Sequence, residues 1–116
     1  MREPILGFPN FNVEFMLQVD ACDTSLGYVL SQEIDGVETA IAFGGRALNK
    51  HEKNYSVYEK ESLSVLSAIK HFHHYLYGRH FTVYCDNTAV TWLFSQKEPR
   101  GRVARWIMSL MEYDFT

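Results

Sequence analysis

Three acidic side chains stand at positions where carboxylates are uncommon. Asp20 ends the apolar segment "FMLQV" and Asp86 ends "FTVYC", although aspartate is a poor strand former. Glu61 lies in a segment with helical periodicity, on the face that also carries Val65 and Ala68, so it points at least partly toward the expected core. Each acid alone has an ordinary explanation, as a cap of the following turn or as a partner of the helix dipole. Because the three occur together, one shared site is the alternative.

The chemistry of such a site follows from its charges. If the strands that end at Asp20 and Asp86 are neighbours, about 4.8 Å apart, their carboxylates leave the sheet side by side and the helix can bring Glu61 over them. Two unit charges about 4 Å apart repel by roughly 4 kcal/mol at an effective dielectric of about 20, so the group must bind protons or a cation. Oxygen ligands favour Mg²⁺ or Mn²⁺ over zinc. The spacing therefore predicts a two-metal site for phosphoryl transfer, with a structural acid cluster as the alternative.

The elements that must position these acids can be predicted from periodicity. The segment "FMLQVD", residues 15–20, alternates as a half-buried strand does. The segments "YVLSQEI" and "ETAIAFG" flank Asp35 and Gly36, a pair suited to the positive φ angles of a tight hairpin turn. The first part of the chain therefore predicts a three-stranded antiparallel meander.

A long helix is expected next. Ser56, followed three residues later by Glu59, has the form of a capping box, and Gly78 marks a stop after about twenty helical residues. Leu63 and Leu66 point to nearly the opposite side from the face of Glu61. We therefore expect this helix to be covered on both sides.

The remaining sequence predicts one more strand and two helices. "FTVYCD" has the pattern of a strand, Asn87 or Thr88 can cap a short helix "AVTWLFS", and Pro99 with Gly101 interrupts the chain. Apolar residues within 103–111 recur at helical spacing and predict a last helix. The order βββαβαα indicates an α/β fold, with a mixed sheet and helices packed on it, and with a right-handed crossover where a helix joins parallel neighbours.

Composition narrows the class of protein. The chain has 116 residues, of which 47% are hydrophobic, so residues 1–116 should form a single domain. No apolar run is long enough to span a bilayer and no secretory signal is present, so we expect a soluble, intracellular protein without a membrane partner. The net charge of −3 argues against nucleic-acid binding by bulk electrostatics alone. The basic segment "KEPRGRVAR" either contacts phosphates or is a solvated loop and helix start.

Two other groups of residues have simple structural interpretations. Cys22 and Cys85 lack metal-site spacing and are expected to be buried thiols rather than a disulfide. The segment "HFHH", residues 71–74, suggests zinc, but consecutive helical residues point in different directions. A polar helix face with one buried aromatic ring is therefore favoured.

Beyond these local patterns, the segments "LQVDACDTSLGYVLSQ", "RALNKHEKNYSVYEKESLSVLSAIKHFHHYLYGRHFTVYCDN" and "GRVARWIMSLMEYDFT" closely resemble a known family. It is the ribonuclease H domain that follows reverse transcriptase in gypsy-type long-terminal-repeat retrotransposon polyproteins. The resemblance implies a ribonuclease H-like fold with a mixed five-stranded sheet. It also implies cleavage of the RNA strand of RNA/DNA hybrids, dependent on two Mg²⁺ or Mn²⁺ ions. The family's acids fall on Asp20, Glu61 and Asp86, the residues that spacing had selected.

The same resemblance implies what surrounds the domain. The family continues past "EYDFT" to a further strand and a helix with another aspartate, so the chain is expected to be C-terminally truncated, with its last strand and helix largely missing. Residues 1–12 resemble the junction with the upstream polymerase, which makes the reverse transcriptase of the same polyprotein an expected partner beside the RNA/DNA hybrid. The protein would act in the cytoplasmic retroelement particle or in the nucleus. A domesticated, catalytically weak module that binds nucleic acid or protein is the alternative.

Substrate contacts are expected from side chains near the acids or in the basic segment, because a hybrid is held mainly by phosphate and 2′-hydroxyl contacts. Each candidate also has an ordinary role as a cap, turn or solvated residue. The candidates are Arg46, Asn54, Tyr55, Asn87, Lys97, Arg100 and Arg102.

Overall fold

The first three strands form the antiparallel meander that the sequence predicts. The structure is a computed structural model that describes residues 7–116, apart from the side chain of Asn87, so part of the expected junction at 1–12 lies outside the described residues. The strands are β1 (Phe15–Ala21), β2 (Ser25–Ile34) and β3 (Val37–Ala47). Asp35 and Gly36 join β2 to β3 with φ angles of 54° and 77°, as a two-residue hairpin turn requires.

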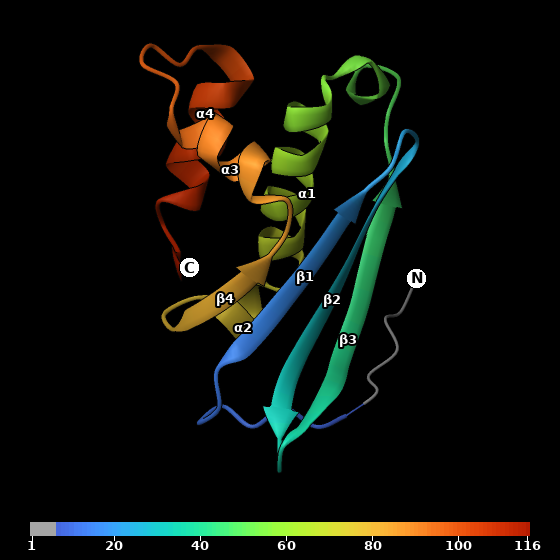
Figure 1. The fold of residues 1–116 in the computed structure, drawn as a ribbon, viewed down its shortest axis with the longest axis vertical. Helices are drawn as coiled ribbons and strands as arrows, with labels where there is room; N and C mark the ends of the chain where they lie inside the picture. The colour runs from blue at the N-terminus through green and yellow to red at the C-terminus, as the bar shows by residue number, and fades with distance from the viewer. Residues whose placement is uncertain (1–6) are drawn as a thin grey trace.

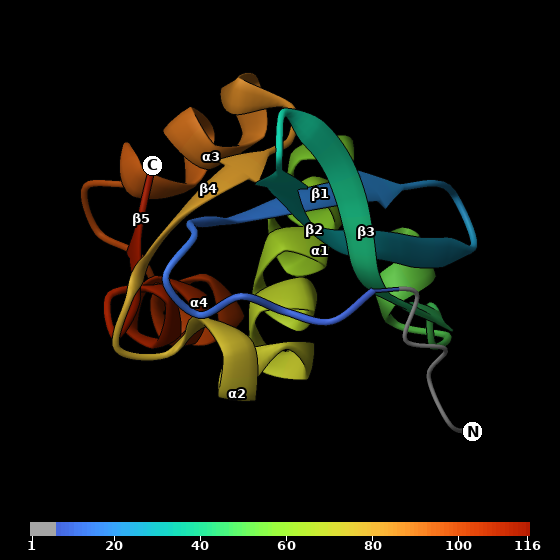
Figure 2. The ribbon, with the colours of Figure 1, turned by 90° about the horizontal axis from the view of Figure 1, so that it is seen from below.

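Two further strands extend the meander into a mixed sheet (Figures 1 and 2). They are β4 (His80–Tyr84) and β5 (Asp114–Phe115), and the strand order is β3-β2-β1-β4-β5. β4 runs parallel to both of its neighbours, which confirms the mixed α/β sheet and the expected proximity of the first and fourth strands. The connection from β3 to β4 therefore crosses over β2 and β1.

The short fifth strand differs from the expectation that the last strand would be largely missing. The Thr116 N–H donates to the Phe81 carbonyl at 3.1 Å, and the Val83 N–H donates to the Thr116 carbonyl at 3.0 Å. The backbone that follows the last helix thus pairs with β4, because the segment "EYDFT" leads directly along that strand.

The helices are η1 (Glu52–Asn54), α1 (Val57–His71), α2 (His73–Leu76), α3 (Asn87–Phe94) and α4 (Gly101–Leu110). The start of α1 confirms the capping box: the Ser56 hydroxyl accepts from the Glu59 N–H, and the Glu59 carboxylate accepts from the Ser56 N–H. α1 ends at His71, earlier than predicted. Phe72 leaves helical geometry with φ −99° and ψ 23° and packs its buried ring edge-on against Tyr28. Gly78, with a φ of 83°, follows α2 instead of ending one long helix.

The core lies between one face of the sheet and α1, and α2 and α4 lie on the same side of the sheet (Figure 2). Phe15 of β1 and Val65 of α1 are at most 1% exposed. On the other side of α1, Leu63 and Leu66 are also buried, next to Trp106 of α4. The helix is therefore covered on both sides, as predicted.

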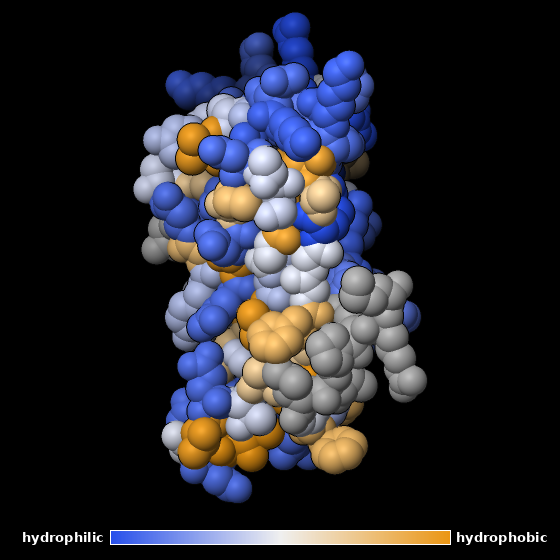
Figure 3. Space-filling model, turned by 90° about the vertical axis from the view of Figure 1, so that its right-hand side faces the viewer, coloured by the Kyte–Doolittle hydropathy of each residue, from blue (hydrophilic) through white to orange (hydrophobic). Residues whose placement is uncertain are grey.

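The outer surface keeps some apolar side chains. Leu110 of α4 is buried as the helical pattern predicts, but Met111 lies just past the helix and is 73% exposed. Val37 and Phe43 on β3 are exposed, and the β3 side of the molecule shows separate hydrophobic patches among hydrophilic side chains (Figure 3). Within residues 7–116, no helix is both long and apolar enough to cross a membrane.

Candidate active site

The pairing of β1 with β4 brings two of the predicted acids together. The parallel register runs from Phe15 opposite Phe81 to Gln18 opposite Tyr84. Continued at the same offset, it places Asp20 opposite Asp86, just beyond the last pair. Neighbouring strands are about 4.8 Å apart, so the two aspartates leave the sheet side by side. The assumption on which the site prediction depended, that these strands are neighbours, is thereby confirmed.

The third acid reaches this pair from the first turns of α1. The Glu61 side chain is partly buried, and its pKa is raised above the ordinary glutamate value by burial, then by the negative charges of Asp20 and of Asp86. A hydrogen bond from the Asp86 backbone N–H opposes the shift without cancelling it. Since an anion disfavours the ionised form of another nearby, the charges of Asp20 and Asp86 add to the effect of burial on Glu61.

Asp86 also has the structural role that was weighed against catalysis. It is the N-cap of α3, where its Oδ1 accepts a hydrogen bond from the Thr88 N–H at 2.9 Å. The prediction that Asn87 or Thr88 caps this helix is therefore wrong by one or two residues. A capping aspartate keeps its second carboxylate oxygen, so the cap restricts the side chain without using up its charge.

The three acids suit Mg²⁺ or Mn²⁺ by their donor chemistry, but they are not gathered around one point. Over residues 7–116, no three His, Cys, Asp or Glu side chains are arranged to hold a metal ion. Alternation along β1 puts Asp20 on the face of the exposed Gln18, away from the buried Leu17. The raised pKa of Glu61 is nevertheless what a cation would reverse. Asp20, Glu61 and Asp86 are thus the residues that would hold one.

The cysteines are not the pair of buried thiols that the sequence predicts. Both are free, but Cys22 is exposed, and a hydrogen bond from the Ser25 hydroxyl is the main cause that lowers its pKa to about 7. Cys85 is half-buried, and burial, with the charges of Glu61 and Asp86, raises its pKa to about 11. A thiol with such a pKa is protonated at neutral pH.

The predicted substrate-binding residues divide into engaged and exposed side chains. Arg46 donates to both carboxylate oxygens of Glu52, at 2.7 and 2.8 Å. Arg102 pairs with Glu59 and lies 4.1 Å from the centre of the Tyr55 ring. The other candidates are less constrained: Asn54 donates weakly to the Lys50 carbonyl, Lys97 and Arg100 are exposed, and the Asn87 side chain lies outside the described residues.

One feature beside the acids was missed by the sequence reasoning. Tyr58 of α1 and Trp92 of α3 stack with ring centroids 5.9 Å apart, and they line a small cavity together with Thr88 and Thr91. Tyr58 lies one helical turn from Glu61, and Trp92 lies on the short helix that begins after Asp86. These positions relative to the two acids could have identified the aromatic pair from the sequence.

These elements define an α/β domain in which adjacent parallel strands carry acids at their ends and a helix brings a third. Residues 10–113 match the RNase H-like domain found in reverse transcriptase, and the chain belongs to this family. It is 44% identical over 115 residues to the retrovirus-related Pol polyprotein from transposon 297 of Drosophila melanogaster, covering 99% of this chain and 10% of that polyprotein. It is 31% identical over 117 residues to the transposon Tf2-3 polyprotein of Schizosaccharomyces pombe, covering 97% and 9%. The chain therefore spans about a tenth of these relatives.

Solved structures show the same fold. The foamy viral protease-reverse transcriptase in complex with dsDNA superposes with a TM-score of 0.69 at 14% identity, covering 96% of this chain and 24% of that one. The same viral protein in complex with an RNA/DNA hybrid gives a TM-score of 0.64 at 15% identity, covering 91% and 15%. At these identities, the likeness concerns the fold.

Proposed function

We propose that this domain hydrolyses the RNA strand of RNA/DNA hybrids, with Asp20, Glu61 and Asp86 holding two Mg²⁺ or Mn²⁺ ions. The observation that carries the proposal is the parallel pairing of β1 with β4, beyond whose last pair Asp20 and Asp86 follow at the same offset, together with the raised pKa of Glu61. Membership of the RNase H-like family supports the class of reaction. A protein of the same fold is described in complex with an RNA/DNA hybrid, which supports the substrate.

The chain's own residues supply charge and position. Bound ions would activate a water and stabilise the leaving oxygen of the phosphodiester. Asp20 lies near the end of β1 and Asp86 two residues past β4, so the ladder between these strands brings their backbones to the same edge of the sheet. Glu61 comes from the helix whose start is held by the Ser56 capping box. One anchor on β1, one at the N-cap of α3 just past β4 and one on a capped helix make a rigid frame, as a catalytic site requires.

The setting that we propose is a retroelement polyprotein. Its relatives are Pol polyproteins, which supports a reverse transcriptase in the same chain as the partner and the cytoplasmic particle or the nucleus as the location. Exposed Lys97 and Arg100, with Asn54 and Asn87, are the proposed contacts to the hybrid backbone. Arg46, Arg102 and Tyr55 would act by holding the neighbouring segments, because each is already packed or paired.

Cleavage of a hybrid with a labelled RNA strand, in Mg²⁺ or Mn²⁺, tests this function. We expect Asp86→Asn to abolish cleavage and Asp23→Asn to keep it, because Asp23 is a fully exposed acid outside the cluster. Equal turnover by the two variants would refute the catalytic assignment. The same samples should show a rise in melting temperature on addition of Mg²⁺ for Asp23→Asn but not for Asp86→Asn.

A second candidate is a binding module that keeps the fold without the chemistry. It is favoured by the absence of a preassembled three-ligand arrangement within residues 7–116 and by the engagement of Asp86 as a cap. A version of the chain extended to the family's length separates the two. Hybrid binding without cleavage by both the chain and its extended version would establish the binding module and exclude the nuclease.

A further inference from the structure

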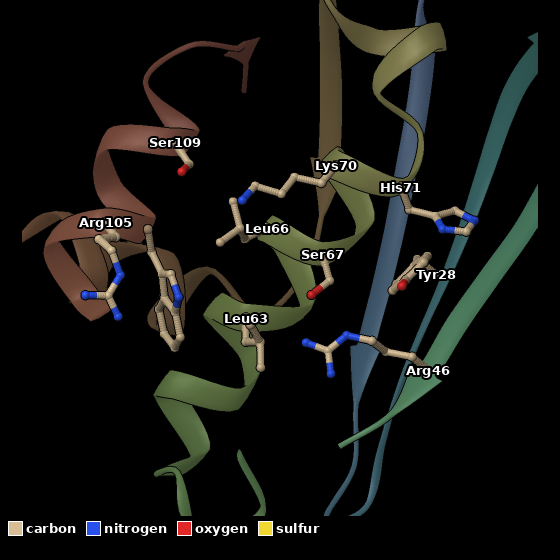
Figure 4. Close-up of a pocket in the computed structure, with 10 residues that line it drawn as sticks. Tyr28, Arg46, Leu63, Leu66, Ser67, Lys70, His71, Arg105 and Ser109 are labelled. Carbon is tan, nitrogen blue, oxygen red and sulfur yellow. The ribbon is translucent and has the colours of Figure 1, made fainter. Parts of the chain in front are cut away.

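A groove lined by both polar and apolar side chains lies on the side of α1 opposite Glu61 (Figure 4). Leu63, Leu66, Ser67 and Lys70 line it, and helical spacing puts them on the face opposite Glu61. A helix with its side chains is about 10–12 Å across. A ligand in this groove therefore occupies a different place from one held by the acids.

Three cationic side chains enter the groove from three elements. Arg46 comes from β3, Lys70 from α1 and Arg105 from α4, and Figure 4 shows them spread along the groove rather than directed at one point. The hydroxyls of Ser67 and Ser109 lie along the same groove. No carboxylate belongs to the described residues that line it. The groove is therefore locally positive, although the chain has a net charge of −3.

Two of these cations lack a partner within the described part of the chain. Lys70 and Arg105 are exposed, and neither forms an ion pair with any of residues 7–116. Arg46 differs, because Glu52 binds its guanidinium through two hydrogen bonds. The groove thus offers two unpaired cations to an external anion, beside a third that is already paired with Glu52.

The size and lining of the groove indicate an extended anion. Its volume of about 660 Å³ is that of a ligand site rather than of a single ion. Separated cations with hydroxyl donors suit the successive phosphates of a strand. Trp106 and Tyr28 are 7% and 5% exposed, so neither offers a ring face on which a base could stack. Recognition here would depend on backbone charge and not on base sequence.

We propose that this groove binds the phosphodiester backbone of a nucleic-acid strand, without sequence preference, at a site separate from the acidic cluster. This groove proposal depends on the nuclease proposal above in one respect only, which is that the domain's ligand is a nucleic acid. In a polyprotein that handles long nucleic acids, such a groove would hold a strand while another segment lies at the acids. An acidic protein segment carries the same sign of charge, and the experiment below separates it from a phosphodiester.

The test measures binding without catalysis, by fluorescence anisotropy of a labelled DNA duplex in EDTA. The variant is the double substitution Lys70→Gln and Arg105→Gln. The control is Lys50→Gln with Lys53→Gln, which removes the same charge from exposed residues outside the groove lining. Circular dichroism and melting temperature check that both variants are folded.

We expect the groove variant to bind more weakly than the control and to show a smaller dependence on salt. The slope of log K against log salt is negative, and each lost phosphate contact reduces its magnitude by about 0.9. Loss of two contacts therefore reduces the magnitude by about 1.8. The conservative variant Lys70→Arg with Arg105→Lys should keep the wild-type slope. Lys70→Gln alone should reduce the magnitude of the slope by about 0.9, which keeps the test valid if the double variant does not fold.

Two results would overturn the proposal. One is an equal affinity and slope for the groove variant and its control. The other is displacement of the strand by polyglutamate at the same charge concentration as unlabelled DNA, which would assign the groove to an acidic protein segment. Asp86→Asn should bind in EDTA at least as tightly as the wild type, so a failure of the cleavage assay leaves this test unaffected.

Discussion

Glutamates in two neighbouring regions of this molecule have pKa values shifted in opposite directions. Before and at the start of α1, Glu52 and Glu59 are paired with arginines, whereas Glu61, half a turn further on, is affected by the negative charges of two other acids. Hydrogen bonds from Arg46 lower the pKa of Glu52. Burial raises the pKa of Glu59, but bonds from Ser56 and Arg102 outweigh it and the net shift is downward.

The contrast teaches how to separate structural from functional acids on one helix. A carboxylate whose pKa is lowered by a cation contributes to folding at neutral pH. A carboxylate whose pKa is raised by burial and like charges opposes folding there, so its presence calls for another explanation. Glu61 belongs to the second group, and metal binding is the explanation that we propose.

The largest effect that this contrast predicts is on cleavage. Glu61→Gln should lower the cleavage rate by about 100-fold or more, because loss of even an outer-shell partner of a metal ligand costs about 10–100-fold. Its free energy of unfolding without metal should stay equal or rise, since a repelling charge is removed. Initial rates with hybrid in excess, and urea titrations at pH 7, measure the two quantities.

Glu59→Gln is the matched control for that prediction, two residues earlier on α1. It should keep most of the cleavage rate and lose up to about 1 kcal/mol of unfolding free energy, because it removes the charge that pairs with Arg102 while a glutamine oxygen can still serve the capping box. Similar rates for the two variants would remove the distinction between structural and functional glutamates.

The next effect is on stability and concerns Glu52. Glu52→Gln should lower the free energy of unfolding by about 1–2 kcal/mol, between the values for exposed and for buried ion pairs. This intermediate value reflects side chains that are 10% exposed for Glu52 and 40% exposed for Arg46. Glu98→Gln, at an exposed position, should change stability by less than about 0.5 kcal/mol. A loss no larger than that of the control would place Glu52 among the solvated acids.

The framework of these regions was predictable because its signals are local. The Asp35-Gly36 turn and the Ser56–Glu59 capping box each involve residues within one turn, and both are present as predicted. The acids could be selected because each interrupts an apolar pattern. Their juxtaposition could not, since the pairing of β1 with β4 joins segments far apart in the chain.

Long-range partners explain what the sequence reasoning left out. Arg102 and Glu59 are 43 residues apart, and no local pattern links a basic segment to one particular acid. The early end of α1 has a similar origin, because Phe72 turns its ring into a core formed with β2. Such choices depend on tertiary packing, which overrides helix propensity.

The smallest effect concerns a third kind of acid, Asp114, which is exposed and paired with a histidine. His80 Nδ1 and Asp114 Oδ1 are 2.8 Å apart across the β4–β5 pair, and Thr116 Oγ1 lies 2.8 Å from His80 Nε2. The hydrogen bond to Asp114 is the main cause that raises the pKa of His80 above 6.5. A histidine whose pKa is raised by folding stabilises the fold fully below its unfolded pKa and loses that contribution as pH rises through the folded value.

Protection of the Thr116 amide from hydrogen exchange, corrected for intrinsic rates, should therefore decrease slightly as pH rises from about 6 to 8. Asp114→Asn should flatten this dependence, because it removes the negative charge and keeps an acceptor oxygen. An unchanged pH dependence in that variant would assign the effect to Glu14, whose carboxylate lies 3.8 Å from His80 Nε2.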